Sequence, residues 1–585
     1  MQLEAIYHRP LDQFAYMSND HELHIRLRVK KGDASSVFLL HGDPYEIEKG
    51  KWSHAQTEMK KSGTDPLFDY WFISVSPSFR RIRYGFNISN ESENIIYGEK
   101  GFASEAPFDI GFYFCIPYMH PSSLFKAPEW VKDTVWYQIF PDRFANGNKG
   151  NDPDGVLEWG SAEPELDNYF GGDLQGIIDH LDYIKELGFT GIYLTPIFRA
   201  PSNHKYDTVD YFEIDPAFGT KETLKELVNA CHRHGIRVML DAVFNHAGFY
   251  FPPFQDVLEK GEKSRYKDWF HIREFPAVTE PMANYDTFGF YPHMPKFNTE
   301  NPEVADYLLK VGRYWLEEFD IDGWRLDVAN EVSPSFWRRF HSELKAIKPD
   351  LYILGEIWHD SMPWLRGDQF DAVMNYLFTS NVLELFAKET ITPKQFSEEM
   401  TKVHHMYPEP VTRVAFNLVG SHDTPRILTE CGGSLDKLKQ IFTLLLTYTG
   451  TPCIYYGDEI GMDGEMDPGS RKCMDWDLAE QEPELARFTK TLISLRRTYP
   501  VLANEGDLSF ISDEENGTCL AYKRSDSNTT ILIILNTSDK TAKYTLPAWM
   551  RKKEAIDLFR DKEDKRVTDS ILTLEGYGIS VLQIK

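Results

Sequence analysis

The nine residues IDGWRLDVA at positions 321–329 place charged side chains within a short, otherwise mostly apolar run. Runs of similar length recur on both sides of this segment, and helical patterns lie between many of them. Short apolar strands that alternate with helices predict an α/β fold, and eight of them predict a (β/α)8 TIM barrel. The eight runs begin at residues 135, 191, 237, 321, 352, 370, 413 and 452.

Two segments between these runs have the spacing of amphipathic helices. In LQGIIDHLDYIKELG, Ile177, Leu181, Ile184 and Leu187 repeat at helical intervals, and Gly188 supplies a stop. KETLKELVNACHRHG repeats the pattern and ends at Gly235. Each pattern predicts a helix that packs one face against the barrel.

The spacing of the runs also predicts the domain organisation. The third and fourth runs start 84 residues apart, against 31 for the next pair, so we expect an insertion domain at about 246–298. Residues 1–122 alternate in apolar character, as in HELHIRLRVKKG, and predict an N-terminal β-sandwich. The barrel then spans 123–500, and residues 501–585 predict a C-terminal all-β domain.

Composition and charge exclude several classes of partner. The chain carries 63 Lys and Arg against 90 Asp and Glu, a net charge of −27 that argues against nucleic acid and anionic membrane surfaces. No run approaches the ~18 apolar residues of a membrane span. The six cysteines form no CxxC pair, and no secretory signal is visible, so we expect a cytoplasmic protein with reduced thiols.

Acidic, basic and histidine side chains gather where four of the predicted strands end. Arg325 and Asp327 are two residues apart on one strand and therefore face the same side. We expect Arg325 to keep Asp327 ionised, and Ile357 and Trp358 to raise the pKa of Glu356. Such a pair of carboxylates suits glycoside hydrolysis, although a buried structural Arg–Asp pair is the alternative.

Four of these segments, DAVFNH, GWRLDVAN, GEIWH and LVGSHD, resemble the four signature regions of the α-amylase family of glycoside hydrolases, family 13. MPKFN at 294–298 resembles a fifth region of the subgroup with neopullulanase, cyclomaltodextrinase and maltogenic amylase, where MPKLN is usual. The resemblance covers the whole chain. It implies a retaining enzyme that cleaves α-1,4 bonds of cyclodextrins, pullulan (to panose) and maltodextrins, with some transglycosylation.

The resemblance also implies roles for individual residues. Asp327 is similar to the family's nucleophile, Glu356 to its acid/base and Asp423 to its third carboxylate, and Asp327 and Glu356 should lie about 5–5.5 Å apart. Asp241 and Asn245 are more typical of orienting groups. For the aromatic members of the expected sugar-binding set, core packing is the alternative. That set is His246, Arg325, His422, Tyr206, Asp207, Trp358, Phe288, Tyr376, Asp467 and Arg471, with His204 as a weaker candidate.

A segment rich in oxygen-bearing side chains predicts a Ca²⁺ site, which the resemblance supports. Asn148 stands where the family commonly has Asp, which removes one charge. A turn rich in Asn and Gly is the alternative. The expected ligands are Asn146, Asn148, Asn151, Asp152, Gly171 and Asp173.

Three other functions stay open at this point. A glucanotransferase would use the same residues with a sugar hydroxyl as acceptor. A non-catalytic glucan-binding relative should have lost carboxylates that this chain keeps. The N-terminal domain could bind starch through an exposed aromatic such as Trp52. The subgroup instead commonly uses this domain to form a homodimer, which we expect here.

Overall fold

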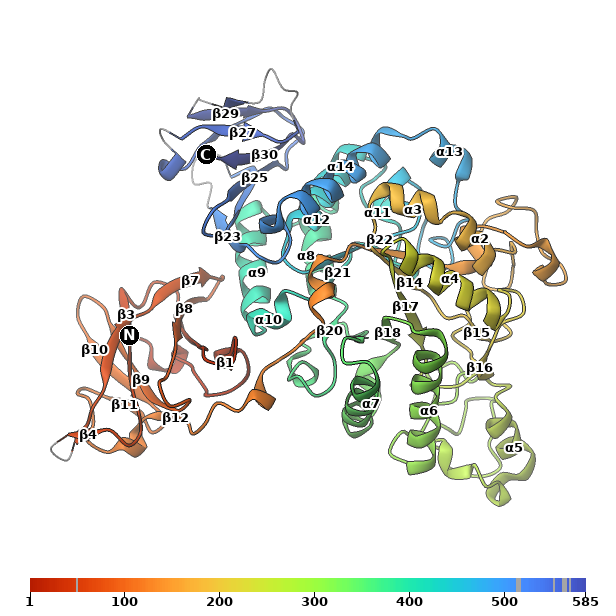
Figure 1. The fold of residues 1–585 in the computed structure, drawn as a ribbon, viewed down its shortest axis with the longest axis horizontal. Coiled ribbons are helices and arrows are strands. Elements are labelled where there is room, and N and C mark those ends of the chain that lie inside the picture. The colour runs from red at the N-terminus through yellow and green to blue at the C-terminus, as the bar shows by residue number, and fades with distance from the viewer. Residues whose placement is uncertain (49–50, 512–516, 551–552, 560–565, 568–569) are drawn as a thin grey trace. The chain divides into compact units, whose positions relative to one another are not determined.

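The computed structural model describes residues 1–48, 51–511, 517–550, 553–559, 566–567 and 570–585 (Figure 1). The chain forms two compact units. The first contains Met1–Lys126, Ile391–Arg413 and Ser509–Leu520, and the second contains Ala127–Thr390, Val414–Leu508 and Ala521–Lys585. The predicted N-terminal domain therefore lies in the first unit, and almost all of the predicted barrel lies in the second.

The N-terminal region consists of two antiparallel sheets, as expected for a β-sandwich. One sheet has the order β1 (Ala15–Met17), β2 (Leu23–Lys30), β8 (Phe68–Val75), β7 (Lys60–Thr64). The other has the order β11 (Gly101–Ala103), β10 (Asn94–Gly98), β9 (Ile82–Ser89), β3 (Ser36–Gly42), β6 (Ala55–Glu58), and β12 (Phe114–Ile116) also pairs with β9. β4 (Ile47–Glu48) pairs antiparallel with β5 (Lys51–Trp52).

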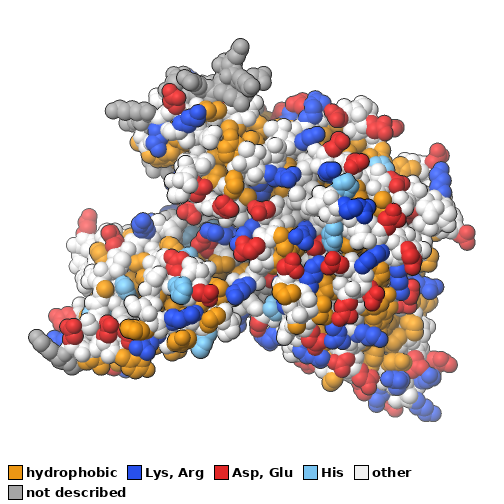
Figure 2. All heavy atoms as spheres, in the orientation of Figure 1, with side chains coloured by type: hydrophobic (Ala, Val, Ile, Leu, Met, Phe, Trp, Pro, Cys, Tyr) orange, Lys and Arg blue, Asp and Glu red, His pale blue; other side chains and the backbone are white. Residues whose placement is uncertain are grey.

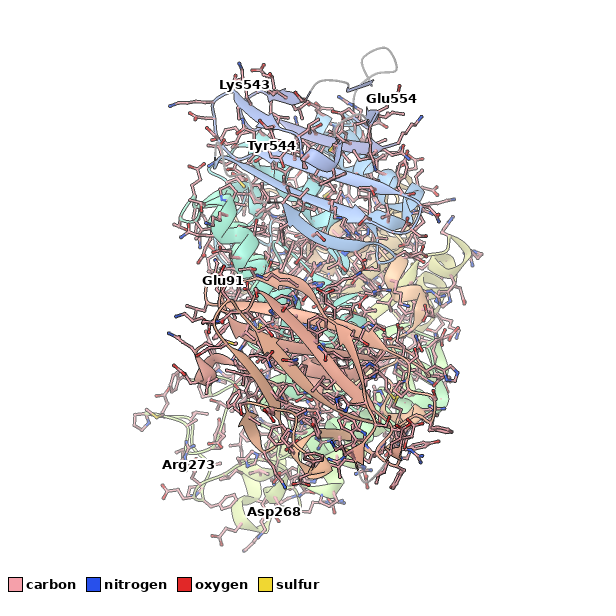
Figure 3. All side chains as sticks on the ribbon, turned by 90° about the vertical axis from the view of Figure 1, so that its left-hand side faces the viewer. Glu91, Asp268, Arg273, Lys543, Tyr544 and Glu554 are labelled. Carbon is pink, nitrogen blue, oxygen red and sulfur yellow. The ribbon has the colours of Figure 1, made fainter. Side chains whose placement is uncertain are left out.

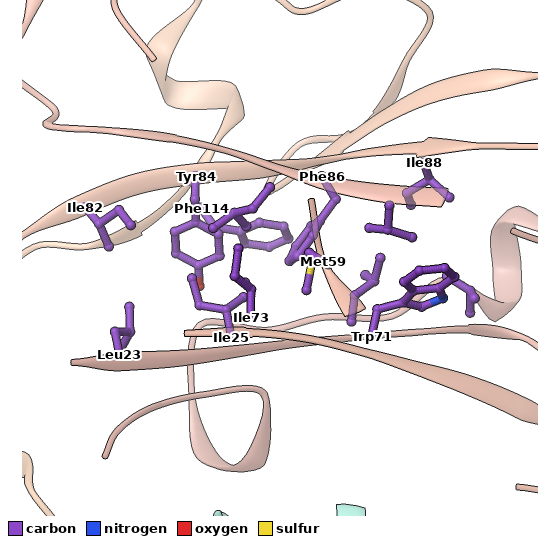
Figure 4. Close-up of a cluster of buried hydrophobic side chains, with 14 of the residues drawn as sticks. Leu23, Ile25, Met59, Trp71, Ile73, Ile82, Tyr84, Phe86, Ile88 and Phe114 are labelled. Carbon is purple, nitrogen blue, oxygen red and sulfur yellow. The ribbon is translucent and has the colours of Figure 1, made fainter. Parts of the chain in front are cut away.

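Alternating side chains of these strands form the core of the sandwich (Figure 4). The predicted inward face of β2 is confirmed, because Leu23, Ile25, Leu27 and Val29 are all buried. Trp52 corrects the sequence-based expectation. Its side chain is only 8% exposed and packs on Tyr113, so it does not offer a free face to starch.

All eight predicted barrel strands are present. They form one parallel sheet in the order β20, β19, β18, β17, β14, β13, β22, β21. A parallel bridge between Met374 and Phe416 joins its two ends and closes the barrel. The strands are β13 (Trp136–Ile139), β14 (Gly191–Leu194), β17 (Arg237–Ala242), β18 (Gly323–Leu326), β19 (Tyr352–Gly355), β20 (Ala372–Val373), β21 (Phe416–Asn417) and β22 (Thr451–Tyr455).

The helices of the second unit include α4 (Lys221–Arg233), α6 (Pro302–Phe319), α7 (Pro334–Ile347), α8 (Tyr376–Val382), α12 (Leu435–Thr447) and α14 (Glu484–Thr498). The predicted helix before Gly188 is two helices, α2 (Leu174–Asp179) and α3 (Leu181–Leu187). His180 interrupts it, with φ −109° and ψ 14°, and its ring stacks on Trp476 with centroids 3.8 Å apart. Gly188 has φ 98° and ends α3 as predicted.

The segment between β17 and α6 corresponds to the expected insertion. It contains α5 (Pro252–Lys260) and otherwise irregular chain, which isolated β-bridges tie together. One of these bridges pairs His246 with Lys296, so both ends of the segment return to the same place. Asp268 and Arg273, labelled in Figure 3, belong to this segment.

The C-terminal region is all-β, as predicted. Its main sheet includes β24 (Cys519–Ser525), β25 (Thr530–Asn536), β30 (Ile579–Ile584), β27 (Ala555–Asp557) and β28 (Arg566–Val567). A separate pair joins β26 (Ala542–Thr545), which carries Lys543 and Tyr544 in Figure 3, to β29 (Ile571–Leu574).

Side chains of both charges are interspersed on the face shown in Figure 2. Among the described residues, no helix is both long enough and apolar enough to cross a membrane.

Candidate active site

A pocket of about 790 Å³ lies where several barrel strands end. Asp327 directly follows β18, and Glu356 directly follows β19. The C-terminal ends of barrel strands are where TIM-barrel enzymes carry their active sites. The lining residues are Leu166, His204, Tyr206, His246, Phe288, Tyr291, Met294, Asp327, Val328, Asn330, Glu331, Glu356, Trp358, Asp423, Met466, Asp467 and Arg471.

Arg325 organises the carboxylates beneath this pocket. Its buried guanidinium donates from Nη1 to Asp241 Oδ2 and to Asp327 Oδ1, each at 2.9 Å. Its Nη2 lies 2.9 Å from Glu356 Oε2 as an ion pair, outside hydrogen-bonding geometry. The sequence predicted the contact with Asp327, but the same cation serves three carboxylates.

The surroundings of Asp327 correct one expectation, and those of Glu356 include hydrogen-bond partners that the sequence did not predict. Burial raises the pKa of Asp327 well above its usual value. Arg325 acts to lower this pKa, whereas the negative charges of Glu356 and Asp241 act to raise it further. Glu356 does not sit in a purely apolar niche. It accepts hydrogen bonds from Val328 N at 2.9 Å and from Trp358 Nε1 at 3.1 Å.

Val328 adopts a backbone conformation that side chains with a branched Cβ rarely take. Its φ of 44° and ψ of 44° are left-handed, which costs about 1–3 kcal/mol. In this conformation its N–H points at Glu356 Oε2. The strained residue therefore lies between the two central carboxylates in the chain and orients one of them.

A chain of hydrogen bonds continues from Asp241 to the barrel interior. Burial raises the pKa of Asp241 to about 6 against the effect of Arg325. Tyr193 OH and Tyr206 OH donate to Asp241 Oδ2 at 2.7 and 3.0 Å. Gln138 Nε2 donates to His422 Nδ1, so a neutral His422 carries its proton on Nε2. His422 Nε2 donates this proton to Tyr206 OH, with 2.6 Å between the nitrogen and the oxygen. Burial lowers the pKa of His422 well below its usual value, consistent with that neutral form.

Asp423 connects to a loop that follows β22. Arg471 Nη2 donates to Asp423 Oδ1 at 3.4 Å, and its Nη1 pairs with Asp467 Oδ1 at 2.9 Å. Arg471 Nε also donates to the carbonyl of His422 at 3.0 Å. Arg471 thus holds two carboxylates and the backbone of the LVGSHD segment in one arrangement.

His246 also lines the pocket and stacks against Phe288, with ring centroids 5.2 Å apart. Burial lowers its pKa to about 3, so the ring is neutral at physiological pH. Its Nε2 is buried and has no hydrogen-bond partner among the described residues. A neutral, pocket-lining ring nitrogen without a protein partner is suited to a hydroxyl group of a ligand.

Comparisons with known proteins match the whole chain. The family model described as alpha amylase, catalytic domain, matches residues 138–498, and models for the N-terminal ig-like domain and the maltogenic amylase C-terminal domain match 1–120 and 508–581. The chain belongs to the α-amylase family of glycoside hydrolases. It is an enzyme that acts on O-glycosyl bonds, as the sequence resemblance predicted.

Individual relatives of this glycoside hydrolase are similar along their full length. A maltogenic alpha-amylase from Bacillus acidopullulyticus is 63% identical over 582 residues, which cover 99% of each chain. A cyclomaltodextrinase from Geobacillus thermopakistaniensis is 56% identical over 587 residues, covering 100% of each. The solved structure of a cyclomaltodextrinase matches with a TM-score of 0.95 at 48% identity, covering 100% of both chains.

The α-amylase-family pocket brings together most of the residues predicted from sequence. The three carboxylates line it, together with His246, Tyr206, Trp358, Phe288, Asp467, Arg471 and the weaker candidate His204. Arg325 and His422 lie buried beneath it and contact lining residues. Asp207 is not among the lining residues and binds Ser202 Oγ instead.

Tyr376, expected among the sugar-binding residues, does not line the pocket. It is the first residue of α8, is buried, and stacks flat on Trp358 at 3.5 Å between centroids. Trp358 itself is 50% exposed, so Tyr376 supports one face of the indole.

Several lining residues were not found from sequence. Leu166, Tyr291, Met294, Asn330, Glu331 and Met466 all line the pocket. Asn330 is the last residue of the GWRLDVAN motif and Glu331 follows it directly, so their position offered a signal. Leu166 and Met466 lie in irregular loops without periodicity, where only the fold shows that they meet.

The six expected calcium ligands converge in two groups. Asn146 Nδ2 donates to Asp152 Oδ1 at 2.7 Å, and a Cβ at Gly171 would fall within 2.5 Å of both side chains. Asp173 accepts from the backbone of Gly147 and Asn148 and from Asn151 Nδ2, at 3.0–3.2 Å. In the described part of the chain, no three His, Cys, Asp or Glu side chains form a metal cluster, so amide and backbone oxygens would have to contribute.

Proposed function

We propose that this glycoside hydrolase cleaves α-1,4-glucosidic bonds of cyclodextrins, maltodextrins and pullulan with retention of configuration. The observation that carries the proposal is the single guanidinium of Arg325 that contacts both Asp327 and Glu356 at 2.9 Å. Two carboxylates held by one cation favour the short separation of about 5–5.5 Å used by retaining enzymes. The names of the full-length relatives support these substrates.

In this proposal Glu356 gives a proton to the glycosidic oxygen as Asp327 attacks the anomeric carbon, so the leaving sugar departs as an alcohol. Glu356 then takes a proton from water as the water oxygen bonds to the anomeric carbon, which breaks the ester bond to Asp327 and restores both groups. The cycle needs Glu356 protonated and Asp327 ionised when the sugar binds, and the Arg325 guanidinium that donates to Asp327 at 2.9 Å favours the ionised form of Asp327. Asp423 and His246 are positioned to bind sugar hydroxyls.

Apolar side chains at the pocket support a neutral, flat-faced substrate. Trp358, Tyr291, Met466 and Leu166 line the pocket and are largely exposed. Aromatic and thioether faces contact the C–H faces of sugars without requiring charge. The substrate is tested by comparing kcat/KM on β-cyclodextrin, pullulan and soluble starch. We expect β-cyclodextrin to be preferred and pullulan to give panose, and a clear preference for starch would refute the proposal.

We also propose some transglycosylation, because the same exposed walls can hold an acceptor sugar. Incubation of maltotriose with excess glucose should yield new linked products beside hydrolysis products. Products from hydrolysis alone, at all acceptor concentrations, would exclude it.

We propose that Ca²⁺ binds the loop of Asn146, Asp152 and Gly171. The support is Asn146 Oδ1, a buried oxygen without a hydrogen-bond partner among the described residues. Oxygen ligands of this kind suit Ca²⁺. Chelation should lower the melting temperature by a few degrees and Ca²⁺ should restore it, whereas Asn146→Ala protein should not respond. An unchanged melting temperature in the wild type would contradict the site.

We propose a cytoplasmic homodimer formed through the N-terminal region. Cys115, Cys231, Cys431, Cys453 and Cys473 are free thiols, as is usual in a reducing compartment. In the first unit, exposed Tyr45 and Phe79 flank the Arg81 guanidinium at 4.6 and 5.3 Å. Sedimentation at micromolar concentration should show a dimer that Phe79→Ser weakens, and a wild-type monomer would refute this assembly.

A further inference from the structure

Arg143 is a buried arginine outside the pocket lining that connects two walls of the pocket. It lies in α1 (Pro141–Phe144), directly after β13. Its Nη1 donates to the carbonyl of Arg471 at 2.9 Å. Its Nη2 donates to the carbonyl and to Oδ1 of Asn168, each at 2.9 Å. One rigid fork therefore ties the loop of Leu166 to the loop of Arg471.

Further contacts fix the orientation of this fork. Arg143 Nε donates to Asp142 Oδ2 at 2.6 Å, and the carbonyl of Arg143 accepts from Met474 N at 2.8 Å. The loop is thus attached to Arg143 at Arg471 and again three residues later. Asn168 has a second support, because Asn203 Nδ2 donates to its carbonyl at 2.7 Å. The Arg471 loop has further supports as well, because Arg426 Nε donates to the carbonyl of Ser470 at 2.9 Å and Arg471 Nε to that of His422 at 3.0 Å, so Arg143 acts together with them.

We infer that Arg143 is a positioning residue that sets sugar affinity through Arg471, an inference that rests on the sugar-binding role proposed for Arg471. Arg471 in turn contacts Asp423 and Asp467, both of which line the pocket. A lysine at 143 would keep the charge, but its donors all sit on one nitrogen, which cannot reach the separate positions that Nε, Nη1 and Nη2 of one planar guanidinium occupy. Arg143→Lys should therefore loosen the loop while it preserves the buried charge.

The test is a double-mutant cycle measured on β-cyclodextrin. Arg471→Met should raise KM about tenfold, and Arg143→Lys about fivefold with kcat changed by less than about threefold. The double variant should match Arg471→Met alone, because Arg143 acts through it. The control is Arg496→Lys, because Arg496 is also a buried arginine that donates to backbone carbonyls. This substitution should leave KM unchanged.

Each result separates the alternatives. The inference would be overturned if the increases in KM caused by Arg143→Lys and Arg471→Met multiply in the double variant. A wild-type KM for Arg143→Lys would also overturn it. A wild-type KM for Arg471→Met would instead overturn the sugar-binding role itself. If Arg143→Lys does not fold, Asp142→Asn weakens the Nε contact together with the bonds that Asp142 accepts from Phe170 N and Gly171 N. It should raise KM in the same direction and likewise add nothing to Arg471→Met.

Discussion

Two buried guanidinium groups, at opposite ends of the barrel strands, have different kinds of partner. Arg325, near the C-terminal end of β18, contacts Asp241, Asp327 and Glu356. Arg496 in α14 donates to the carbonyl of Gly450, which immediately precedes β22, and to those of Leu446, Tyr448 and Leu502.

The pKa values move in opposite directions. Burial lowers the pKa of Arg496 to about 9, and Arg524 adds to that effect. Burial also acts to lower the pKa of Arg325, but Asp241 and Glu356 raise it well above its usual value. Carbonyl partners fix the chain, whereas carboxylate partners concentrate negative charge beside a pocket. The same residue type thus serves rigidity at one end and chemistry at the other.

The largest expected effect is loss of turnover in Asp327→Asn. Removing the nucleophile should lower kcat on β-cyclodextrin on the order of 10⁴-fold or more. The melting temperature should stay level or rise, because one of several crowded, buried negative charges is gone. Calorimetry should still detect maltose binding. Near-normal turnover would show that Asp327 is not the nucleophile.

The two arginines can be compared directly. Arg325→Met should abolish most activity and destabilise the fold by about 3–5 kcal/mol, because buried carboxylates lose their cation. Arg496→Met should also destabilise, by at least about 3 kcal/mol, because several carbonyls lose their donor. The folded fraction of Arg496→Met, however, should keep wild-type kcat. Denaturant titration and active-site-normalised kinetics measure both, and a changed kcat in Arg496→Met would break the comparison.

Asp241→Asn should move the acid limb of the pH profile of kcat/KM to lower pH by about one unit. Asp241 is a negative neighbour that raises the pKa of Asp327, so its removal lets Asp327 ionise at lower pH. Asp467→Asn is the control, since Asp467 is not among the groups that shift Asp327. An acid limb that stays in place or moves upward would contradict the coupling.

The smallest expected effect concerns strain at the pocket. Val328→Gly should change the free energy of unfolding by less than about 1 kcal/mol, because glycine adopts the left-handed conformation readily. Val332→Gly, where the backbone is extended (φ −92°) and the side chain buried, should cost at least about 2 kcal/mol. Equal losses at the two positions would show that Val328 stores no strain.

The sequence predicted the barrel because each strand is a short apolar run buried on both sides. It predicted Asp327, Glu356 and Asp423 because their motifs are local. It did not predict the break at His180, which depends on Trp476 almost 300 residues later. The pKa of Asp327 was predicted in the wrong direction, because only the fold shows how deeply Asp327 is buried and how many carboxylates share Arg325.

The closure between β20 and β21 has a consequence for the motions of the barrel. These two strands have two residues each, and the bridge from Met374 to Phe416 joins them. The chain between them contributes Ile391–Arg413 to the first unit. This seam has few ladder bonds to break, so its amide protons should exchange with solvent earlier than those of β17 and β18. Because the pairing of β20 and β21 opens locally at low cost, a circularly permuted chain should tolerate new termini between these two strands.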